Sequence, residues 1–422
     1  MLEISRIKEQ KSEIIELLKI RDFDAEEIIE DILNLDKEWR SSKSELDAVA
    51  AESNKIAKEI GMLFGQGKVE EANAAKAKTS DLKVKTKELN DQVSDLANQI
   101  TKKLYEVPNV PNKIVPFGKS DADNEVIFED APEVMLPKGA LPHWELAKKH
   151  DLIDFEMGVK VTGAGFPFYT GKGARLQRSL INFFLDEARD FGYKEIIPPF
   201  VVNEASGIGT GQLPDKEGQM YHCGVDDLYL IPTGEIPITN MFRDVIVKAE
   251  DFPIQVTGYT PCFRREAGSY GKDVRGLNRL HQFDKVEIVR VEHPDNSYKA
   301  LDEMVAYVES LLKKLELPYR KLKLCGGDLG FTSALTFDLE VYSAAQKMWL
   351  EVSSISNFET FQANRLKLRF KNEDKKNVLA HTLNGSALAL PRILASILEN
   401  NQTEDGINIP KVLVPYTGFD KI

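Results

Sequence analysis

Four arginines, two glutamates and three glycines are concentrated in the segment from Cys262 to Glu287, CFRREAGSYGKDVRGLNRLHQFDKVE. Arginine side chains bind phosphate oxygens through paired hydrogen bonds, and glycines let a backbone approach a ligand closely. The residues on either side of the glycines alternate in the manner of two antiparallel strands. This hairpin is therefore a candidate nucleotide-binding element. Its residues of interest are Arg264, Arg265, Glu266, Gly268, Gly271, Arg275, Gly276, Arg279 and Glu287.

The second strand of this hairpin carries an aromatic and an acidic residue on one face. Successive side chains of a strand point to opposite faces, so Phe283 and Glu287 lie on the same side. Phe283 can stack on a base, and Glu287 can accept hydrogen bonds from an amine or a hydroxyl group. An ordinary half-buried hairpin with surface ion pairs is the alternative. The shared face comprises His281, Phe283, Lys285, Glu287 and Val289.

Two further segments carry oxygen groups suited to binding a substrate or a cation. Thr233–Glu235 follows the predicted strand Leu228–Ile231, although such a tripeptide is by itself a common turn. Glu351 and Ser354, on and just after another predicted strand, place a carboxylate and a hydroxyl where both can reach one cation. Oxygen ligands of this kind suit Mg²⁺. The alternative for this segment is an edge strand with solvent-facing polar groups.

The C-terminal region contains a small-residue segment that is followed by an arginine. Asn384–Ser386 predicts a turn that leads into a buried helix, and Arg392 lies in that helix. Without further context Arg392 is a surface charge. A phosphate-binding P-loop is excluded at Gly171–Lys172, because Gly173 stands where a serine or threonine is required. No GxGxxG follows a predicted strand, so parallel-sheet nucleotide folds lose support.

Composition indicates a globular protein with room for two or three domains in 422 residues. A net charge of -12 argues against indiscriminate coating of nucleic acid, so any RNA contact must come from local basic patches. The three cysteines, Cys223, Cys262 and Cys325, form no CxxC pair, which favours a reducing compartment. We find no signal sequence and no apolar run of 18 residues, and we expect a cytoplasmic protein without membrane contact.

The N-terminal quarter has the pattern of an antiparallel helical hairpin. Apolar residues step by three and four from about Ala25 to Leu63, glycines at 61, 65 and 67 interrupt the pattern, and it resumes from Val69 to Ile100. The second helix has a lysine-rich stretch, which most simply is a solvated face. Its lysines are Lys76, Lys78, Lys83, Lys85 and Lys87.

A proline-punctuated linker at 105–116 separates this hairpin from a region of irregularly spaced strands with few helices, which predicts a mainly antiparallel sheet. An amphipathic helix is expected at Gly171–Asp190 and a strand at Tyr193–Ile197. A long helix is expected from about Asn296 to Leu315. Further strands are expected at Ile254–Cys262, His281–Val291, Tyr319–Leu324, Phe337–Tyr342 and Lys347–Ser353.

The segment Cys262–Glu287 resembles motif 2 of class II aminoacyl-tRNA synthetases, in the form found in seryl-tRNA synthetases. The matching strings are Phe-Arg-x-Glu-Ala-Gly, Arg-Gly-Leu-x-Arg and His-Gln-Phe-x-Lys-Val-Glu. Asn384–Arg392 resembles motif 3, and the helix, strand and proline that end at Pro199 resemble motif 1, a dimer-interface element. The strings PHWELAKKHDLIDFE, GTGQLP and VPYTGFDKI extend the resemblance over nearly the whole chain.

The resemblance implies an α+β protein of three parts. Residues 1–105 form an antiparallel coiled-coil arm that binds tRNA, residues 106–116 form a linker, and residues 117–422 form a class II catalytic domain. That domain is built on a mainly antiparallel sheet flanked by helices. The implied reaction is ATP-dependent attachment of L-serine to tRNA(Ser) through a seryl adenylate, with Mg²⁺ as cofactor. The implied assembly is a homodimer, and tRNA for selenocysteine is a further expected substrate where it is present.

The resemblance also assigns roles to individual residues. The implied serine-binding residues are Thr233, Gly234, Glu235, Arg264, Glu287 and Ser386. The implied ATP-binding residues are Arg264, Arg265, Glu266, Arg279, Phe283, Glu351, Val352, Ser353, Ser354 and Arg392. Of these, Glu351 and Ser354 would hold the metal. The lysines between Lys76 and Lys87 become candidates for contacts with tRNA phosphates.

Three positions depart from the family pattern. Gly234 replaces a small side chain, Ile355 replaces a cysteine, and Asn364 replaces an arginine. Two other kinds of protein share the motifs: a paralogue that loads an amino acid onto a carrier protein, and a non-catalytic descendant. The long basic-faced hairpin disfavours the paralogue. A non-catalytic descendant should have lost one of four key residues, and all are present: Arg264, Glu287, Glu351 and Arg392.

Overall fold

The computed structural model of the chain describes residues 1–132, 134–215, 218–266 and 275–422. Gly268 and Gly271, predicted to lie in a glycine-rich ligand loop, fall outside these residues. The chain forms two compact units. The arm unit comprises Leu2–Lys19 and Phe23–Pro108, and the sheet unit comprises Met1, Ile20–Asp22 and Asn109–Ile422.

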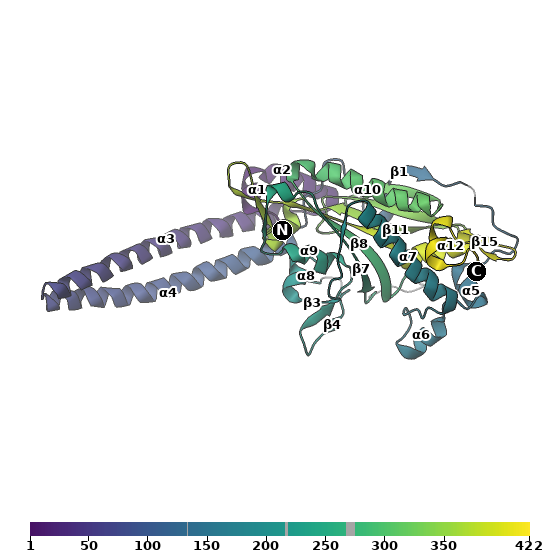
Figure 1. Cartoon of the computed structure of the whole chain (residues 1–422). Coiled ribbons are helices and arrows are strands. Elements are labelled where there is room, and N and C mark those ends of the chain that lie inside the picture. Colours follow the sequence, from purple (N-terminus) through teal and green to yellow (C-terminus); the bar gives the residue numbers. More distant parts are fainter. Residues whose placement is uncertain (133, 216–217, 267–274) are drawn as a thin grey trace. The chain divides into compact units, whose positions relative to one another are not determined.

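The arm unit is dominated by two long helices, α3 (Glu26–Gly65) and α4 (Val69–Glu106), which run side by side (Figure 1). Leu46 and Val49 of α3 are buried against Leu89 of α4, so the predicted seam is the contact surface between the helices. Apolar residues at heptad spacing bury one stripe of each helix, which is what holds such a hairpin together. Two short helices, α1 (Ile4–Glu9) and α2 (Lys11–Leu18), precede them.

The sheet unit is built on an eight-stranded sheet with the strand order β1-β9-β10-β11-β14-β8-β7-β2. Each neighbouring pair is antiparallel except β2 and β7, which are parallel. The mainly antiparallel sheet expected from the sequence is therefore confirmed. The strands are β1 (Glu125–Asp130), β2 (Lys194–Glu195), β7 (Ile254–Phe263), β8 (Gln282–Glu292), β9 (Tyr319–Lys323), β10 (Leu335–Ser343), β11 (Met348–Asn357) and β14 (His381–Ala389).

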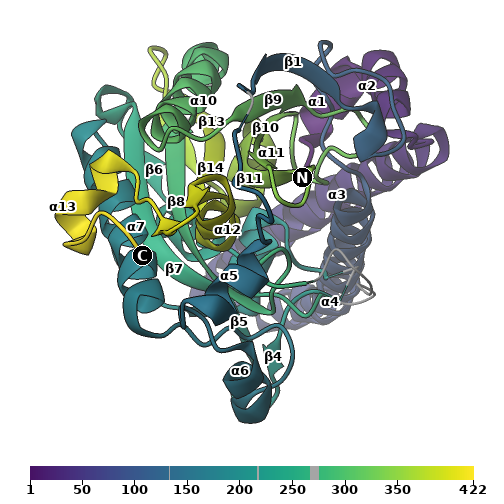
Figure 2. The ribbon, with the colours of Figure 1, turned by 90° about the vertical axis from the view of Figure 1, so that its right-hand side faces the viewer.

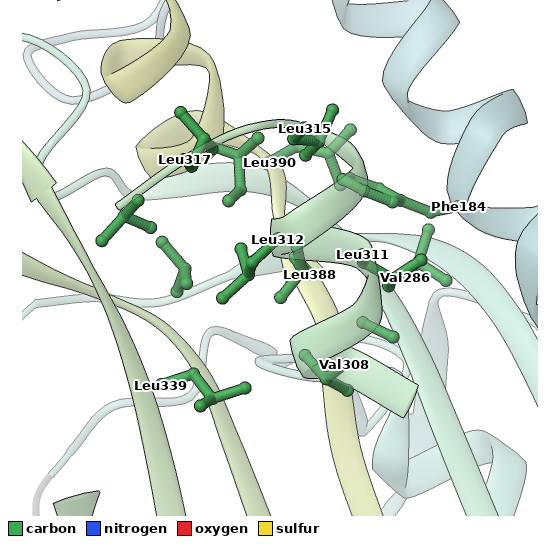
Figure 3. Close-up of a cluster of buried hydrophobic side chains, with 14 of the residues drawn as sticks. Phe184, Val286, Val308, Leu311, Leu312, Leu315, Leu317, Leu339, Leu388 and Leu390 are labelled. Carbon is green, nitrogen blue, oxygen red and sulfur yellow. The ribbon is translucent and has the colours of Figure 1, made fainter. Parts of the chain in front are cut away.

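Three helices, α7 (Gly171–Asp190), α10 (Ser297–Lys314) and α12 (Leu390–Asn400), pack on one face of this sheet (Figure 2). Leu311 and Leu312 of α10 point into the main core, beside Phe184 of α7 (Figure 3). The core takes Val286 and Ile288 from β8. Because strand side chains alternate, the intervening residues of β8 point to the opposite face of the sheet.

Smaller elements surround the sheet. The short helices are α5 (His143–Lys149), α6 (Phe155–Val161), α8 (Glu204–Thr210), α9 (Glu235–Thr239), α11 (Thr360–Leu366) and α13 (Val414–Thr417). The short strands are β3 (Val201–Asn203), β4 (His222–Cys223), β5 (Leu228–Leu230), β6 (Ile246–Val247), β12 (Arg369–Lys371), β13 (Asn377–Leu379), β15 (Gln402–Thr403) and β16 (Gly406–Ile407). Among the described residues, no helix is both long and apolar enough to cross a membrane.

The structure corrects one expected element. Asn384–Ser386 was predicted to form a turn, but these residues lie inside β14, between β11 and β8. Small residues suit this central strand because the neighbouring strand packs closely against it. A Cβ at Gly385 would lie 3.0 Å from the Ile355 side chain. Packing between two neighbouring strands has overridden the local turn preference. The helix that contains Arg392 begins only at Leu390.

Candidate active site

A buried polar cluster lies on the face of β8 that points away from the main core. The ammonium group of Lys285 is 2.6 Å from Glu287 Oε2, and it donates to Thr233 Oγ1 at 2.9 Å. The Thr233 hydroxyl donates to Glu287 Oε2 at 3.1 Å. Burial raises the pKa of the Glu287 carboxyl, and the Lys285 charge opposes that rise. Without the Lys285 cation the buried Glu287 carboxylate would be uncompensated, which is strongly unfavourable.

Glu235, at the start of α9, is the second buried carboxylate of this cluster. Gln362 Nε2 donates to its Oε1 at 2.6 Å, and Gln212 Nε2 donates to its Oε2 at 3.0 Å. Burial raises the pKa of Glu235 to about 7, and the nearby Glu287 carboxyl adds to this rise. Burial and the Glu287 charge thus disfavour the charged form of Glu235, and an incoming ammonium group would offset both effects.

Two further residues assigned to serine binding lie beside Glu287. Ser386 of β14 is directly opposite Glu287 in the strand register and is buried. Gly234 is packed tightly, since a Cβ at this position would lie 3.1 Å from Thr260 Oγ1 and 3.2 Å from the Glu287 Cβ. A side chain at 234 would therefore require Thr260 and Glu287 to shift by a few tenths of an ångström.

The arginines of the β7–β8 hairpin contact protein groups in this structure. The Arg264 guanidinium lies over the Phe283 ring, with 5.1 Å from Cζ to the ring centroid, and its Nε donates to the Pro232 carbonyl at 3.3 Å. Arg279 forms an ion pair with Glu266. Arg265 is exposed. The structure thus brings Arg264 and Phe283 into contact, and it pairs two other expected ATP-binding residues, Arg279 and Glu266, with each other.

A register shift in β11 places Glu351 and Ser354 on one face of the sheet. Strict alternation would put residues three apart on opposite faces. Here Glu351 pairs with Glu340 while Ser354 pairs with Asp338, so one extra residue in β11 restores a common face. Val352 and Ser353 lie within this irregular stretch and are buried. Ser354 lies inside the strand and not just after it, since β11 continues to Asn357.

The groups around Glu351 and Ser354 fit a hard cation. Asp338 is buried beside them, its Oδ1 has no hydrogen-bond partner among the described residues, and a side-chain hydrogen bond joins it to Ser354. Burial and the Glu351 charge raise the pKa of the Asp338 carboxyl. Three oxygen-bearing side chains on one sheet face match the ligand preference of Mg²⁺.

Arg392, in the first turn of α12, lies next to this acidic group. Its Nη1 donates to the Glu351 carbonyl at 2.7 Å and is 3.8 Å from the Glu351 carboxylate. Its Nε donates to the Asn278 carbonyl at 3.1 Å. Arg392 is therefore positioned by backbone carbonyls from two segments and is not an unattached surface charge.

Three residues of the site were not assigned roles from the sequence: Lys285, Gln362 and Asn384. Lys285 was expected on the same face as Glu287, and the structure shows in addition that the two side chains form a buried ion pair. Gln362 and Asn384 both hydrogen-bond the Glu235 carboxyl from distant parts of the chain. The shared strand face was a usable signal for Lys285, whereas no local sequence signal connects Gln362 to Glu235.

The lysine-rich stretch of α4 is exposed, as its sequence predicts. Lys85 forms an ion pair with Glu45 of α3 at 2.7 Å, and this hydrogen bond raises the pKa of the Lys85 ammonium. No ion pair is found for the four other lysines within the described part of the chain. These four are Lys76, Lys78, Lys83 and Lys87.

Comparison with known proteins identifies a family match in each of the two units. Residues 221–401 match the family model of the tRNA synthetase class II core domain (G, H, P, S and T), and residues 1–111 match the seryl-tRNA synthetase N-terminal domain. The sheet and its polar cluster are thus those of a class II aminoacyl-tRNA synthetase. Serine–tRNA ligases of Salinibacter ruber and Akkermansia muciniphila are 50% and 44% identical to the chain, with 100% of this chain and 99% of each relative covered. The chain belongs to the seryl-tRNA synthetase family.

Solved structures agree with this assignment. The seryl-tRNA synthetase of Pyrococcus horikoshii, solved in complex with ATP, superimposes with a TM-score of 0.91 at 35% identity, and the match covers 100% of this chain and 99% of that one. The cytoplasmic serine–tRNA ligase of Naegleria fowleri, solved in complex with AMP, gives a TM-score of 0.86 at 28% identity, and the match covers 100% of this chain and 98% of that one. As a family member, the chain is an enzyme that attaches serine to tRNA in an ATP-dependent reaction.

Proposed function

We propose that the enzyme works in two steps through a seryl adenylate. A carboxylate oxygen of L-serine attacks the α-phosphorus of ATP, the bond to the β-phosphate oxygen breaks, and pyrophosphate leaves. A terminal ribose hydroxyl of tRNA then attacks the adenylate carbonyl, releases its proton, and AMP leaves. The first step depends on positioning and charge neutralisation more than on a general base. Arginines and buried carboxylates, as present here, suit that requirement.

The observation that carries this proposal is the buried cluster of Thr233, Lys285 and Glu287 opposite Ser386. We assign the serine hydroxyl to Glu287 and Ser386, and the serine ammonium group to Glu235 and the Thr233–Glu235 loop. Alanine lacks the hydroxyl and cannot form the hydrogen bonds that serine would make with these groups, which disfavours its binding. Threonine carries an extra methyl group, which must be excluded by size.

ATP binding in this proposal exchanges internal contacts for contacts with the nucleotide. The adenine stacks on Phe283 and its amine lies near Glu266, while Arg264 holds the α-phosphate. Arg279 and Arg392 hold the outer phosphates, and Arg265 adds positive charge nearby. The Arg264–Phe283 stacking and the Arg279–Glu266 ion pair are therefore contacts that ATP replaces. Both arginines would therefore exchange these protein contacts for phosphate oxygens when ATP binds.

We assign the Mg²⁺ of this reaction to Glu351 and Ser354. When bound, the ion would offset negative charge on the ATP phosphates. The support is that the β11 register shift places both residues on one sheet face, beside the Asp338 oxygen that has no hydrogen-bond partner among the described residues. Val352 and Ser353 contribute to the ATP site through the backbone geometry of the same irregular stretch.

We further propose that residues 1–105 act as a tRNA-binding arm, joined by a linker at 106–116 to a catalytic domain at 117–422. A long helical hairpin can recognise tRNA by shape and backbone contacts, and its exposed lysines are the candidate phosphate contacts. Serylation of selenocysteine tRNA and a cytoplasmic location belong to the same proposal. A homodimer is supported by the exposure of Ile197 at 84%, two residues before the motif 1 proline, Pro199.

The decisive experiment is pyrophosphate exchange with each standard amino acid, followed by charging of total tRNA with the best substrate. We expect exchange with serine and serylation of tRNA. Serine exchange without tRNA charging would favour an enzyme that loads a carrier protein. Absence of exchange with any amino acid would refute the adenylate mechanism for this chain.

A further inference from the structure

A fully buried hydrogen-bonded pair of side chains lies outside the residues assigned to substrates. His143 begins α5 and Glu399 lies in the last turn of α12, and both side chains have 0% exposure. His143 Nδ1 is 2.7 Å from Glu399 Oε1, and the His143 backbone N–H donates to the same oxygen at 2.8 Å. The Ser343 hydroxyl donates to Glu399 Oε2, and Gln346 Nε2 donates to Oε1 at 2.9 Å. The Glu399 carboxyl is thus fully occupied by protein donors.

The second ring nitrogen of His143 contacts the segment that leads into β8. The backbone N–H of Leu277 donates to His143 Nε2 at 2.8 Å. A backbone N–H can only donate, so Nε2 is an acceptor and the ring proton is on Nδ1. His143 therefore receives a hydrogen bond from Leu277 and donates its own proton toward Glu399, which fixes both the tautomer and the ring orientation.

Gly276 is fitted to the His143 ring. Its φ angle is +67°, and a Cβ added there would lie 2.2 Å from His143 Nε2. Both the backbone angle and the lack of space therefore require glycine. The contact between ring and backbone is closer than any residue with a side chain permits, which indicates a built connection rather than incidental packing.

The segment held by His143 connects directly to the proposed ATP site. The Asn278 carbonyl accepts a hydrogen bond from Arg392 Nε, and Asn278 Nδ2 donates to Gln346 Oε1 at 2.8 Å. Gln346 in turn donates to Glu399. Arg279 is the next residue of the chain. A displacement of this segment would therefore move the contacts of both Arg279 and Arg392.

We propose that His143 is a positioning residue for ATP: with Glu399 as its buried partner, it fixes Gly276–Asn278 and so places Arg279 and Arg392 for the outer phosphates. This inference rests on the proposed function, but it concerns the ATP side of the site. None of the contacts above involves Thr233, Lys285 or Glu287. Weakening the His143 contact should therefore affect ATP much more than serine.

The test compares His143→Gln with His143→Asn in pyrophosphate exchange. A glutamine oxygen can occupy the place of Nε2 and accept from Leu277, whereas asparagine reaches only the place of Nδ1 and leaves the Leu277 N–H unpaired. An unpaired buried donor is unfavourable. We expect KM for ATP to rise on the order of tenfold in His143→Asn. We expect KM for ATP in His143→Gln to stay close to wild type, and KM for serine to change less than about twofold in both.

The matched control is His150→Asn at the other end of α5, which should change neither KM. Equal effects of the two His143 variants on KM for ATP, or an equal rise in KM for serine, would overturn the proposal. Hydrogen exchange of the segment 275–280 gives a readout without activity. Exchange should be faster in His143→Asn than in His143→Gln. Unchanged exchange of this segment in both variants would contradict the proposal that His143 holds it in place.

A measurement on the unaltered protein covers the case in which a variant does not fold. With ¹⁵N-histidine labelling, the His143 ring should show a protonated Nδ1 and an unprotonated Nε2. The reverse tautomer would refute the Leu277 contact. If the wild-type enzyme shows no serine-dependent exchange, the proposed function fails, while the tautomer and hydrogen-exchange results still decide whether His143 anchors the segment.

Discussion

The Lys285 ammonium and the Glu287 carboxylate form an ion pair at 2.6 Å with only 8% and 2% of their side chains exposed. Both groups also contact the Thr233 hydroxyl, so three side chains from two segments hold one another in place. A buried ion pair of this kind loses much hydration, and either charge left alone is strongly unfavourable. The proposed serine pocket is therefore organised by the protein's own charges before serine enters.

Replacing Lys285 with methionine should destabilise the fold and abolish serine activation. The change leaves the Glu287 carboxylate buried without its cation, which should lower the free energy of unfolding by about 3–5 kcal/mol. Serine-dependent pyrophosphate exchange should disappear as well. Denaturant unfolding and exchange assays on the purified variant test both effects.

The matched control for Lys285→Met is the double variant Lys285→Met/Glu287→Gln. Removing the second charge should recover most of the unfolding free energy without restoring exchange. A single variant as stable as wild type would contradict the structural role of the pair. Recovery of exchange in the double variant would contradict the assignment of Glu287 to serine.

Replacing Glu235 with glutamine should change how stability depends on pH. Burial raises the Glu235 pKa from 4.5 to about 7 in the folded protein. The folded state therefore binds more protons than the unfolded state between these values, so the stabilising contribution of Glu235 is present at low pH and is lost as pH rises toward 7. Glutamine does not titrate. Relative to wild type, Glu235→Gln should gain about 2 kcal/mol in unfolding free energy between pH 5 and pH 8.

Denaturant unfolding at pH 5, 6, 7 and 8 measures this effect. Glu373→Gln, at an exposed position outside the site, is the control and should run parallel to wild type. Parallel curves for Glu235→Gln and wild type would show that the pKa of the Glu235 carboxyl does not change on folding.

The sequence was sufficient to predict the elements whose burial follows a regular period. The arm helices were anticipated because apolar residues recur at heptad spacing over many turns, and α7 because one of its faces is consistently apolar. The β7–β8 hairpin followed from alternation on both sides of the glycines. Phe283 and Glu287 could be placed on one face for the same reason.

Other features depend on contacts between residues far apart in the sequence, which no local sequence pattern predicts. Asn384–Ser386 has turn-forming residues, but β8 and β11 pair with it on both sides and make it a strand. The common face of Glu351 and Ser354 arises from a register shift, which single-strand alternation cannot predict. The Gln362–Glu235 contact joins residues 127 positions apart. These long-range pairings form only when the sheet assembles.

Neutralising four exposed lysines of α4 should impair tRNA charging and spare serine activation. The quadruple variant Lys76→Gln/Lys78→Gln/Lys83→Gln/Lys87→Gln keeps Lys85, whose charge is engaged by Glu45. We expect a higher KM for tRNA and a weaker salt dependence, with the slope reduced by about 0.7–0.9 for each phosphate that the arm no longer binds. Pyrophosphate exchange should be unchanged. Charging assays over a series of salt concentrations provide the measurement.

A second quadruple variant controls for the general loss of positive charge. Its exposed lysines lie in the sheet unit: Lys371, Lys375, Lys376 and Lys411. Glutamine at these positions should leave KM for tRNA near wild type. If the two variants lose tRNA charging to the same extent, the α4 lysines have no specific role in tRNA binding and are simply solvent-exposed charges.

Replacing Ser354 with alanine should weaken the proposed Mg²⁺ site while leaving serine binding intact. Ser354 lies on the same sheet face as Glu351 and opposite Asp338, so its hydroxyl can be a ligand while a carboxylate orients it. We expect the Mg²⁺ concentration for half-maximal exchange to rise about tenfold. Mn²⁺ binding followed by electron paramagnetic resonance should weaken to a similar degree.

Ser356→Ala is the control, because Ser356 hydrogen-bonds Thr336 at 2.8 Å and lies two residues beyond the proposed ligand. A metal requirement that shifts equally in both variants would place the cation elsewhere. A shift confined to Ser354→Ala would tie the register shift of β11 directly to metal binding, since without the extra residue Ser354 would face the opposite side of the sheet from Glu351.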